Sequence, residues 1–153
     1  WDVVPATAAD GSAVYGLWAS PDCRDFSVAK GGKPRDKKIR SLAWSVTRWC
    51  RPGPAQPQVV FVENVREFAG WGPLLPNGKR DPKRKGKTFR AWIAKLRKYG
   101  YAVEWRVLNA ADYGAGTNRR RLFIVARRDG QPIVWPKPTH GKGLLPYVTA
   151  ADS

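Results

Sequence analysis

Apolar residues occur in four short runs along the chain, at residues 14–18, 59–62, 101–108 and 121–128. Each run has the length of a β-strand, and turn-forming residues precede the first two. Because the first two runs are apolar throughout rather than alternating, they predict buried strands, and residues 59–62 predict a parallel one. The pattern therefore predicts a sheet of four strands.

Two further segments place apolar residues at the spacing of an α-helix. Residues 37–50 form the first, with a basic outer face, and residues 89–96 form the second. Thr88 is expected to cap the second helix and Gly100 to end it. The repeating positions are Ile39, Leu42, Ala43, Val46 and Cys50 in the first helix and Phe89, Trp92, Ile93 and Leu96 in the second.

The order strand, helix, strand, helix and then two strands is typical of an α/β fold with an open sheet. Ligands of such sheets gather at the carboxyl ends of the strands, where Cys23 and Glu63 both fall. Residues 73–87 contain Pro, Gly and a dense basic cluster, which predicts a mobile surface loop. A phosphate backbone is the natural partner of that loop.

Charge indicates a polyanionic partner. The chain of 153 residues has the length of one domain, and 42% of its residues are apolar, which suffices for a core. It contains 28 Lys and Arg against 12 Asp and Glu, a net charge of +16. Nucleic acid is the leading candidate to offset this charge. Arg codons of a GC-rich genome are the alternative explanation.

The cysteine, histidine and hydrophobic content excludes several classes of protein. Cys23 and Cys50 are too few for a disulfide framework, and one histidine, His140, far from both in sequence, gives no metal site. No apolar run approaches the roughly 20 residues that span a membrane. A reducing, intracellular compartment is therefore expected. The chain begins at Trp1 and ends at Ser153, and both ends are interpreted as cuts.

Two polar sites follow the first two strands. Cys23 lies near Arg24 and Lys30, and basic neighbours favour a reactive thiolate. An inert, buried cysteine is the alternative. Glu63 ends the second strand, where its carboxyl group can hydrogen-bond a ring nitrogen of a base. Capping of the next segment by Glu63 and Asn64 is the alternative there.

Three arginines precede the last apolar run. If they enter a strand, Arg119 and Arg121 point to one side of the sheet and Arg120 to the other. Two guanidinium groups on one face suit a phosphate or a carbonyl oxygen.

Three separated segments resemble, in the family's order, motifs of the DNA (cytosine-5) methyltransferases. Residues 20–27 are similar to the Pro-Cys loop, motif IV, with Cys23, Phe26 and Ser27 in register. Residues 63–65, Glu-Asn-Val, are the tripeptide of motif VI. The joint occurrence of these motifs is far more specific than any one of them.

Residues 108–125 resemble motifs VII and VIII, and the arginines of the family's Gln-x-Arg-x-Arg pattern correspond to Arg119 and Arg121. The resemblance covers about residues 14–128 and is strongest to the phage and prophage branch. Three residues depart from the pattern: Asp22 stands for Pro, and Arg24 and Thr117 stand for Gln.

The resemblance implies the catalytic half of a Rossmann-like, class I S-adenosylmethionine-dependent methyltransferase, with residues 1–153 as a single incomplete domain. The donor-binding motifs and the target-recognition region are expected to lie outside the chain, so the fragment alone is expected to be inactive. S-adenosylmethionine is the implied methyl donor and double-stranded DNA the implied partner. A monomer in the cytoplasm of a bacterial or phage-infected cell, with a role such as restriction-modification, is expected.

The resemblance also implies residue roles. The Cys23 thiolate adds to carbon 6 of a flipped cytosine, Glu63 contacts ring nitrogen 3 and the exocyclic amine, Arg121 contacts the carbonyl oxygen and Arg119 supports these groups. The predicted substrate-binding residues are Ser27, Lys30, Asn64, Lys83, Arg84 and Lys85.

Two alternatives remain open. A nucleic-acid-binding protein without catalysis explains the charge equally well, through the loop at residues 79–87 and the aromatic residues. It does not explain the order and spacing of the motifs. An RNA cytosine-5 methyltransferase keeps the same chemistry, because a related branch of the family modifies transfer RNA.

Overall fold

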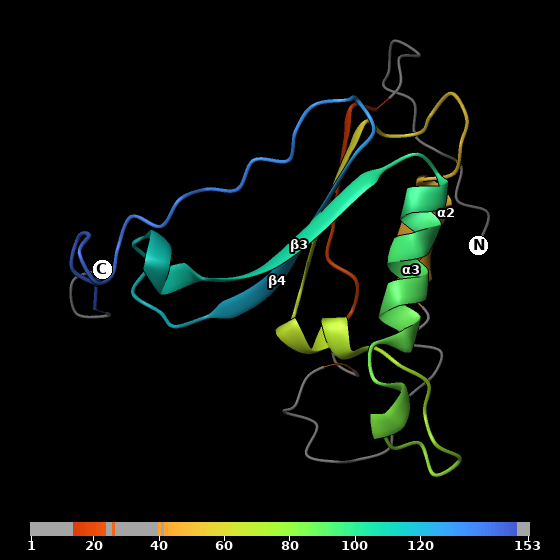
Figure 1. Cartoon of the computed structure of the whole chain (residues 1–153), viewed down its shortest axis with the longest axis horizontal. Helices are drawn as coiled ribbons and strands as arrows, with labels where there is room; N and C mark the ends of the chain where they lie inside the picture. The colour runs from red at the N-terminus through yellow and green to blue at the C-terminus, as the bar shows by residue number, and fades with distance from the viewer. Residues whose placement is uncertain (1–13, 24–25, 27–39, 41, 150–153) are drawn as a thin grey trace.

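The fold is a mixed four-stranded β-sheet with helices on one face (Figure 1). The computed structural model describes residues 14–23, 26, 40 and 42–149. Within them, the strand order is β1-β2-β4-β3. The strands are β1 (Gly16–Ala19), β2 (Val59–Asn64), β3 (Ala102–Asn109) and β4 (Arg120–Arg127), and the helices are α2 (Trp44–Trp49) and α3 (Lys87–Lys98). All four strands were predicted, with boundaries shifted by one or two residues.

One strand opposes the other three. β1 and β2 are parallel, β4 is antiparallel to both β2 and β3, and β3 therefore runs in the same direction as β1 and β2. Residues 59–62 were predicted to form a parallel strand. This prediction is confirmed for the pairing of β2 with β1, whereas β2 pairs with β4 in the antiparallel sense. The connection between β3 and β4, residues 110–119, is too short for a helical crossover, so these strands pair as an antiparallel hairpin.

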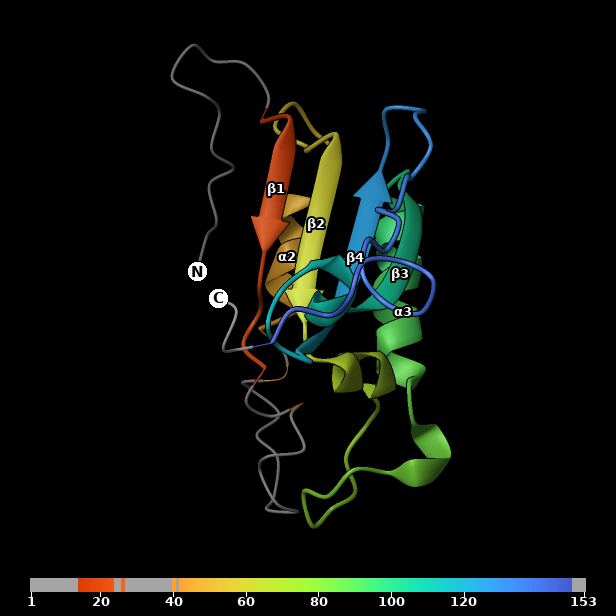
Figure 2. The ribbon, with the colours of Figure 1, turned by 90° about the vertical axis from the view of Figure 1, so that its left-hand side faces the viewer.

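The core lies between the sheet and the two helices. α2 and α3 pack behind the sheet in Figure 2. The strand side chains on that face, such as Val60, Val62, Leu122 and Ile124, are at most 1% exposed. Trp92 is fully buried, and its indole N–H donates to the Ala43 carbonyl at 2.9 Å, which joins α3 to the start of α2.

The opposite face of the sheet is largely open. Trp18 of β1 and Phe61 of β2 are 63% and 40% exposed, and their rings stack with centroids 6.0 Å apart. The sequence predicted strands that are buried on both faces, so this prediction is wrong for β1 and half right for β2. The C-terminal segment passes over the lower part of this face, in front of β3 and β4 in Figure 2.

The beginnings of both helices differ from the prediction. Gly86, with φ +74°, is the N-cap of α3, and Thr88 lies inside the helix without a capping role. The left-handed φ favours glycine at this turn, and a side chain at position 86 would also place its Cβ 3.3 Å from the Ala69 carbonyl oxygen. The helix predicted for residues 37–50 corresponds to α2, which begins only at Trp44. Arg40 is also helical, and residues 37–39 and 41 lie outside the described part of the chain.

The basic loop at residues 73–87 is organised by local contacts. Leu74 and Arg80 form an isolated bridge, and a short 3-10 helix, η3, spans Pro82–Arg84. Asp81 caps η3, because its carboxylate accepts a hydrogen bond of 2.9 Å from the Lys83 backbone N–H. The loop is at the surface as predicted, but its backbone follows a defined path.

Candidate active site at the carboxyl end of the sheet

The end of β2 directs two neighbouring side chains to opposite faces. Asn64 points into the core and is 2% exposed, whereas Glu63 points to the open face. The Asn64 amide donates a 2.8 Å hydrogen bond to the Pro21 carbonyl, and its Oδ1 accepts one of 2.9 Å from the Val65 N–H. Asn64 therefore holds the segment that leads to Cys23, and both ends of its amide are engaged within the protein rather than directed at a substrate.

Cys23 lies at the surface beyond the end of β1. The residue is exposed, and its backbone carbonyl accepts a 2.9 Å hydrogen bond from the Phe26 N–H. Phe26 is 1% exposed and packs edge-on against Phe68 and Trp71. Cys23 is thus tethered on both sides, by Pro21 to β2 and by Phe26 to the core. Ser27 and Lys30, two predicted substrate contacts, lie outside the described residues.

Glu63 forms an ion pair with one of the predicted arginines. The Arg121 Nε and the Glu63 Oε1 are 2.9 Å apart, and both side chains are about one quarter exposed. The pair is diagonal across the β2–β4 ladder, because Glu63 lies opposite Phe123, two residues after Arg121. The Arg121 NH1 group also donates to the Arg120 carbonyl at 3.0 Å. The guanidinium plane is therefore fixed by two partners.

These charged groups line a cavity of about 500 Å³ on the open face. Arg119 and Arg121 both line it, as the predicted alternation of the arginine run requires. The cavity has a polar end at these arginines and Glu63, and apolar walls elsewhere. The remaining lining includes Trp18, Phe61, Asn109, Tyr113, Phe123, Val134, Trp135 and Pro136. The sequence reasoning missed Tyr113 and Trp135, because no periodic pattern marks either of them as facing a site.

The C-terminal strap, defined here as residues 132–147, supplies one wall of this cavity. The backbone N–H groups of Thr139 and His140 donate to the Asp112 carbonyl at 2.9 and 3.1 Å, and the Asp112 carboxylate accepts from the Tyr147 hydroxyl at 3.2 Å. His140 also packs on Gly114, where a Cβ would come within 2.8 Å of the imidazole. The strap is therefore fixed to the turn that precedes the arginine run.

The strap also contacts β3 through an aromatic ring. The Trp135 indole N–H donates a 2.7 Å hydrogen bond to Glu104, and the Arg106 guanidinium lies 5.0 Å from the centre of the Trp135 ring. The Tyr113 hydroxyl donates to the Pro136 carbonyl at 3.3 Å. Trp135 and Pro136 are thus held in place as cavity walls.

Three of the four basic residues predicted to bind substrate, those of the basic loop, lie apart from this cavity. Lys83, Arg84 and Lys85 are exposed on and after η3, and Lys85 lines a second cavity of about 710 Å³ with Arg66 and Arg80. The Arg84 Nε is 2.6 Å from the Asp81 carboxylate, so part of its guanidinium stabilises the loop. The hydrogen bond from Arg84, with a backbone hydrogen bond from Lys83, lowers the pKa of Asp81.

The two cysteines have opposite environments. Cys50 is fully buried, and burial raises the pKa of its thiol to about 12 even though Tyr101 hydrogen-bonds to it. A thiol of this kind stays protonated and unreactive at neutral pH. Of the two cysteines, only Cys23 is exposed to solvent.

Neither a metal site nor a membrane-spanning helix is found in the described part of the chain. Within residues 14–23, 26, 40 and 42–149, no group of three or more His, Cys, Asp or Glu side chains could hold a metal ion. No helix among the same residues is long and apolar enough to cross a bilayer.

Comparison with known proteins decides the family. The family model for C-5 cytosine-specific DNA methylases matches residues 8–146. The chain belongs to this family. Among curated methylases, the Type II methyltransferase M.AquIA of Picosynechococcus sp. is 31% identical over 87% of the chain, and M1.HphI of Haemophilus parahaemolyticus is 40% identical over 87%. The chain spans 56% of the first protein and 32% of the second.

Solved methylase structures share the fold. A putative DNA modification methyltransferase encoded within an Escherichia coli prophage matches 90% of the chain and 33% of its own, with a TM-score of 0.56 and 23% identity. The Entamoeba histolytica methyltransferase EhMeth matches 83% and 36%, with a TM-score of 0.54 and 17% identity. The predicted Rossmann-like methyltransferase fold is confirmed.

Proposed function

We propose that this chain forms the catalytic half of a DNA cytosine-5 methyltransferase and that Cys23 is its nucleophile. The observation that carries the proposal is the hydrogen bond from Asn64 to the Pro21 carbonyl, which ties the cysteine segment to the strand end that bears Glu63. The Cys23 segment and the Glu63–Arg121 pair therefore both lie next to the end of β2, although Cys23 is not among the described residues that line the cavity. Membership of the methylase family supports the same conclusion.

The chemistry requires activation of a carbon that is a poor nucleophile. Addition of the Cys23 thiolate to carbon 6 of cytosine makes carbon 5 enamine-like. The Glu63 oxygen that Arg121 does not hold accepts a hydrogen bond from the exocyclic amine, and the carboxyl group donates the proton that ring nitrogen 3 takes up as the adduct forms. Arg121 contacts the carbonyl oxygen at position 2, and Arg119 supports Glu63, Arg121 or the adjacent phosphate. The cytosine reaches these groups only after it is flipped out of the duplex.

The methyl group in this family comes from S-adenosylmethionine. Nucleotide-like donors bind at a glycine-rich turn that follows a strand and opens a helix. In the described residues, the one helix that opens on glycine is α3 after Gly86, and it follows the basic loop instead of a strand. We therefore assign no donor contact to the described residues.

Residues 1–153 would accordingly be one incomplete catalytic domain. The chain spans about half or less of the curated methylases named above. Donor-binding motifs and a target-recognition region would come from outside it, and the isolated chain would be inactive or nearly so. Action on double-stranded DNA as a monomer, in the cytoplasm of a bacterial or phage-infected cell, belongs to the same proposal.

Covalent trapping tests the proposal. The longer polypeptide and the 153-residue chain are incubated with a pool of duplexes containing 5-fluorocytosine and with S-adenosylmethionine, and adducts are sought by denaturing gel and mass spectrometry. Fluorine at carbon 5 blocks the elimination that releases the enzyme, so the Cys23 adduct should accumulate. Duplexes with 2-pyrimidinone, which accepts a thiolate at carbon 6 without a methyl donor, give the isolated chain its own readout.

Three outcomes separate the alternatives. An adduct at Cys23 with DNA supports the proposal. If RNA containing 5-fluorocytosine is offered in parallel, an adduct formed only with RNA would move the substrate to RNA. Tight DNA binding with no adduct, unchanged in Cys23→Ala, would support a binding protein without catalysis.

A further inference from the structure

The basic loop, residues 73–87, contacts the segment that carries Cys23. The Arg80 guanidinium donates a hydrogen bond through Nη2 to the backbone carbonyl of Phe26, 54 residues earlier in the chain. Phe26 in turn donates its backbone N–H to the Cys23 carbonyl at 2.9 Å. The turn from Cys23 to Phe26 is therefore held at its second end by a side chain of the loop.

The backbone that carries Arg80 is ordered. Leu74 and Arg80 form an isolated bridge, and the Leu75 N–H donates to the Lys79 carbonyl at 2.9 Å. The Gly78 N–H donates to the Leu75 carbonyl at the same distance, which closes a small hairpin over residues 74–80. A side chain on such a backbone loses less conformational freedom on binding its acceptor than one on a free loop.

The ring of Phe26 is fixed separately from its carbonyl. It is 1% exposed and packs edge-on against two aromatic rings of the core. The Arg40 guanidinium lies 5.3 Å from the centre of the same ring. Because the ring cannot move far, the hydrogen bond from Arg80 acts mainly on the backbone, and this backbone carries the N–H that holds the Cys23 carbonyl.

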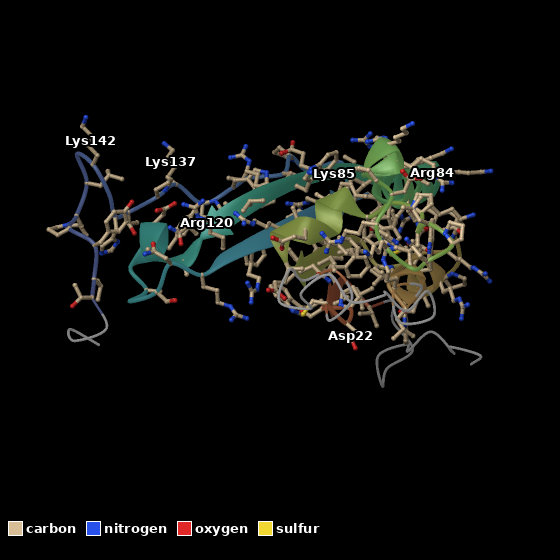
Figure 3. All side chains as sticks on the ribbon, turned by 90° about the horizontal axis from the view of Figure 1, so that it is seen from below. Asp22, Arg84, Lys85, Arg120, Lys137 and Lys142 are labelled. Carbon is tan, nitrogen blue, oxygen red and sulfur yellow. The ribbon has the colours of Figure 1, made fainter. Side chains whose placement is uncertain are left out.

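A short 3-10 helix, η2 (Arg66–Gly70), separates the two segments that Arg80 joins. Figure 3 shows η2 between Lys85 of the basic loop and Asp22, the residue before the nucleophile. A Cβ on Gly70 would lie 3.3 Å from the Lys85 Cε, so the loop rests directly on η2. The nucleophile segment packs on η2 through the aromatic contact described above. Arg80 therefore connects two segments that share one support.

We propose that Arg80 is a positioning residue for Cys23, because its hydrogen bond to the Phe26 carbonyl fixes the turn that presents the thiol. The inference rests on the proposed function for the role of Cys23 as the nucleophile. A hydrogen bond from a charged donor is stronger than one between neutral groups, which suits a contact that holds a backbone turn at the surface. Part of the basic loop thus acts on the site itself, in addition to any contact of the loop with phosphate.

Hydrogen exchange of the Phe26 N–H in the 153-residue chain tests the contact without DNA. Arg80→Ala removes the donor, and Arg51→Ala makes the same substitution at an exposed residue that follows α2. Arg80→Ala should speed exchange of the Phe26 N–H roughly 10- to 100-fold, which corresponds to loss of a hydrogen bond from a charged donor. Arg51→Ala should leave it at the wild-type rate. The N–H of Val60, a core residue of β2, should exchange at its wild-type rate in both variants.

Covalent trapping relates the contact to the nucleophile. In the longer polypeptide, with saturating 5-fluorocytosine duplex and S-adenosylmethionine, Arg80→Ala should form the Cys23 adduct roughly 10- to 100-fold more slowly, as expected for a reacting group displaced by about 1 Å. Arg51→Ala should react at the wild-type rate. Reaction of Cys23 with a small disulfide reagent should not slow in Arg80→Ala, because the thiol stays exposed.

Several outcomes overturn the inference. Unchanged exchange of the Phe26 N–H in Arg80→Ala means that the hydrogen bond does not hold the turn. An equal acceleration at Val60 means that Arg80 supports the whole fold and not this turn. A slow adduct that more DNA restores to the wild-type rate assigns Arg80 to phosphate binding.

The exchange measurement keeps this test independent of the proposed function. Absence of an adduct in every protein, wild type included, would sink the proposed function. Exchange of the Phe26 N–H would still decide whether Arg80 holds the turn that begins at Cys23.

Discussion

The side-chain amide of Asn64 donates a 2.8 Å hydrogen bond to the carbonyl of Pro21, across 43 residues of sequence. The bond joins the end of β2 to the segment that carries Cys23. Glu63 and Asn64 are adjacent in the chain but divide two tasks, since Glu63 faces the cavity and Asn64 faces the core. The position of the segment that carries Cys23 therefore depends on a residue that does not line the cavity.

Removal of the Asn64 amide should lower both the stability of the fold and the reactivity of Cys23, and the two effects can be measured separately. Asn64→Ala leaves the Pro21 carbonyl without its donor, which should cost about 1–3 kcal/mol in the free energy of unfolding. Urea unfolding measures this change. The rate of adduct formation by Cys23 in the longer polypeptide should fall further than the decrease in folded protein explains.

Asn64→Asp is the matched control for that change. It retains an acceptor for the Val65 N–H but removes the donor to Pro21. It should therefore slow the adduct as Asn64→Ala does. If both variants form adducts at the wild-type rate, Asn64 does not position Cys23.

The Glu63–Arg121 pair should control the chemical step. Glu63→Gln removes the negative charge that pairs with Arg121. Arg121→Lys keeps a positive charge but loses the planar guanidinium group with its several N–H donors. Each should lower the rate of methylation at saturating DNA by about 10²–10³-fold, the usual effect of removing one preorganised electrostatic contact.

Asp129→Asn is the control for loss of the Glu63–Arg121 ion pair. It breaks a pair with Arg127 at the far end of β4, where the Arg127 NH2 and Asp129 Oδ2 lie 2.6 Å apart. Methylation per folded molecule should stay near the wild-type rate. A decrease as large as that of Glu63→Gln would show that sheet integrity, and not the site, governs the rate.

The two thiols should differ strongly in reactivity. Cys23 is exposed, whereas Cys50 is buried with its pKa raised to about 12. A thiol-specific disulfide reagent at neutral pH should modify one cysteine per native chain and two in denaturant. Cys50→Ala should keep the fast reaction and Cys23→Ala should remove it, and the reverse assignment would place the nucleophile elsewhere.

The basic loop should loosen in acid. The hydrogen bond from Arg84, with the one from Lys83, lowers the pKa of Asp81 below its ordinary 3.8. Because the native state favours the carboxylate, its stabilisation is complete above pH 3.8 and is lost as the pH falls through the lowered native value. The Lys83 amide resonance should follow this titration by NMR. In Asp81→Asn that pH dependence should be absent.

The sequence predicted the strands and motifs well because both depend on local order. β2 and β4 each contain a continuous apolar run, and Glu63 directly follows the first run while Arg121 directly precedes the second. The direction of β4 was not predictable from its own residues, because only the short turn after β3 sets it. The role of Asn64 was missed for a similar reason, since its partner Pro21 is defined by tertiary structure alone.

The exposure of the open sheet face was not predicted, because the burial of a strand depends on which other segments pack against it in the folded chain. The apolar content of β1 predicted cover on both sides, but Trp18 is 63% exposed and stacks only beside Phe61 of the neighbouring strand. Trp135 was missed because the strap has neither helical nor alternating periodicity, and its place depends on Glu104 and Arg106 of β3.

The stacked rings of Trp18 and Phe61 also bear on how the 153-residue chain behaves in solution. An apolar sheet face in water favours self-association, whereas a charge of +16 drives copies apart. Salt shortens the reach of that repulsion to about 10 Å at 0.1 M but leaves the apolar attraction intact. The chain should therefore remain dispersed in dilute buffer and precipitate as ionic strength rises, the opposite of ordinary salting-in.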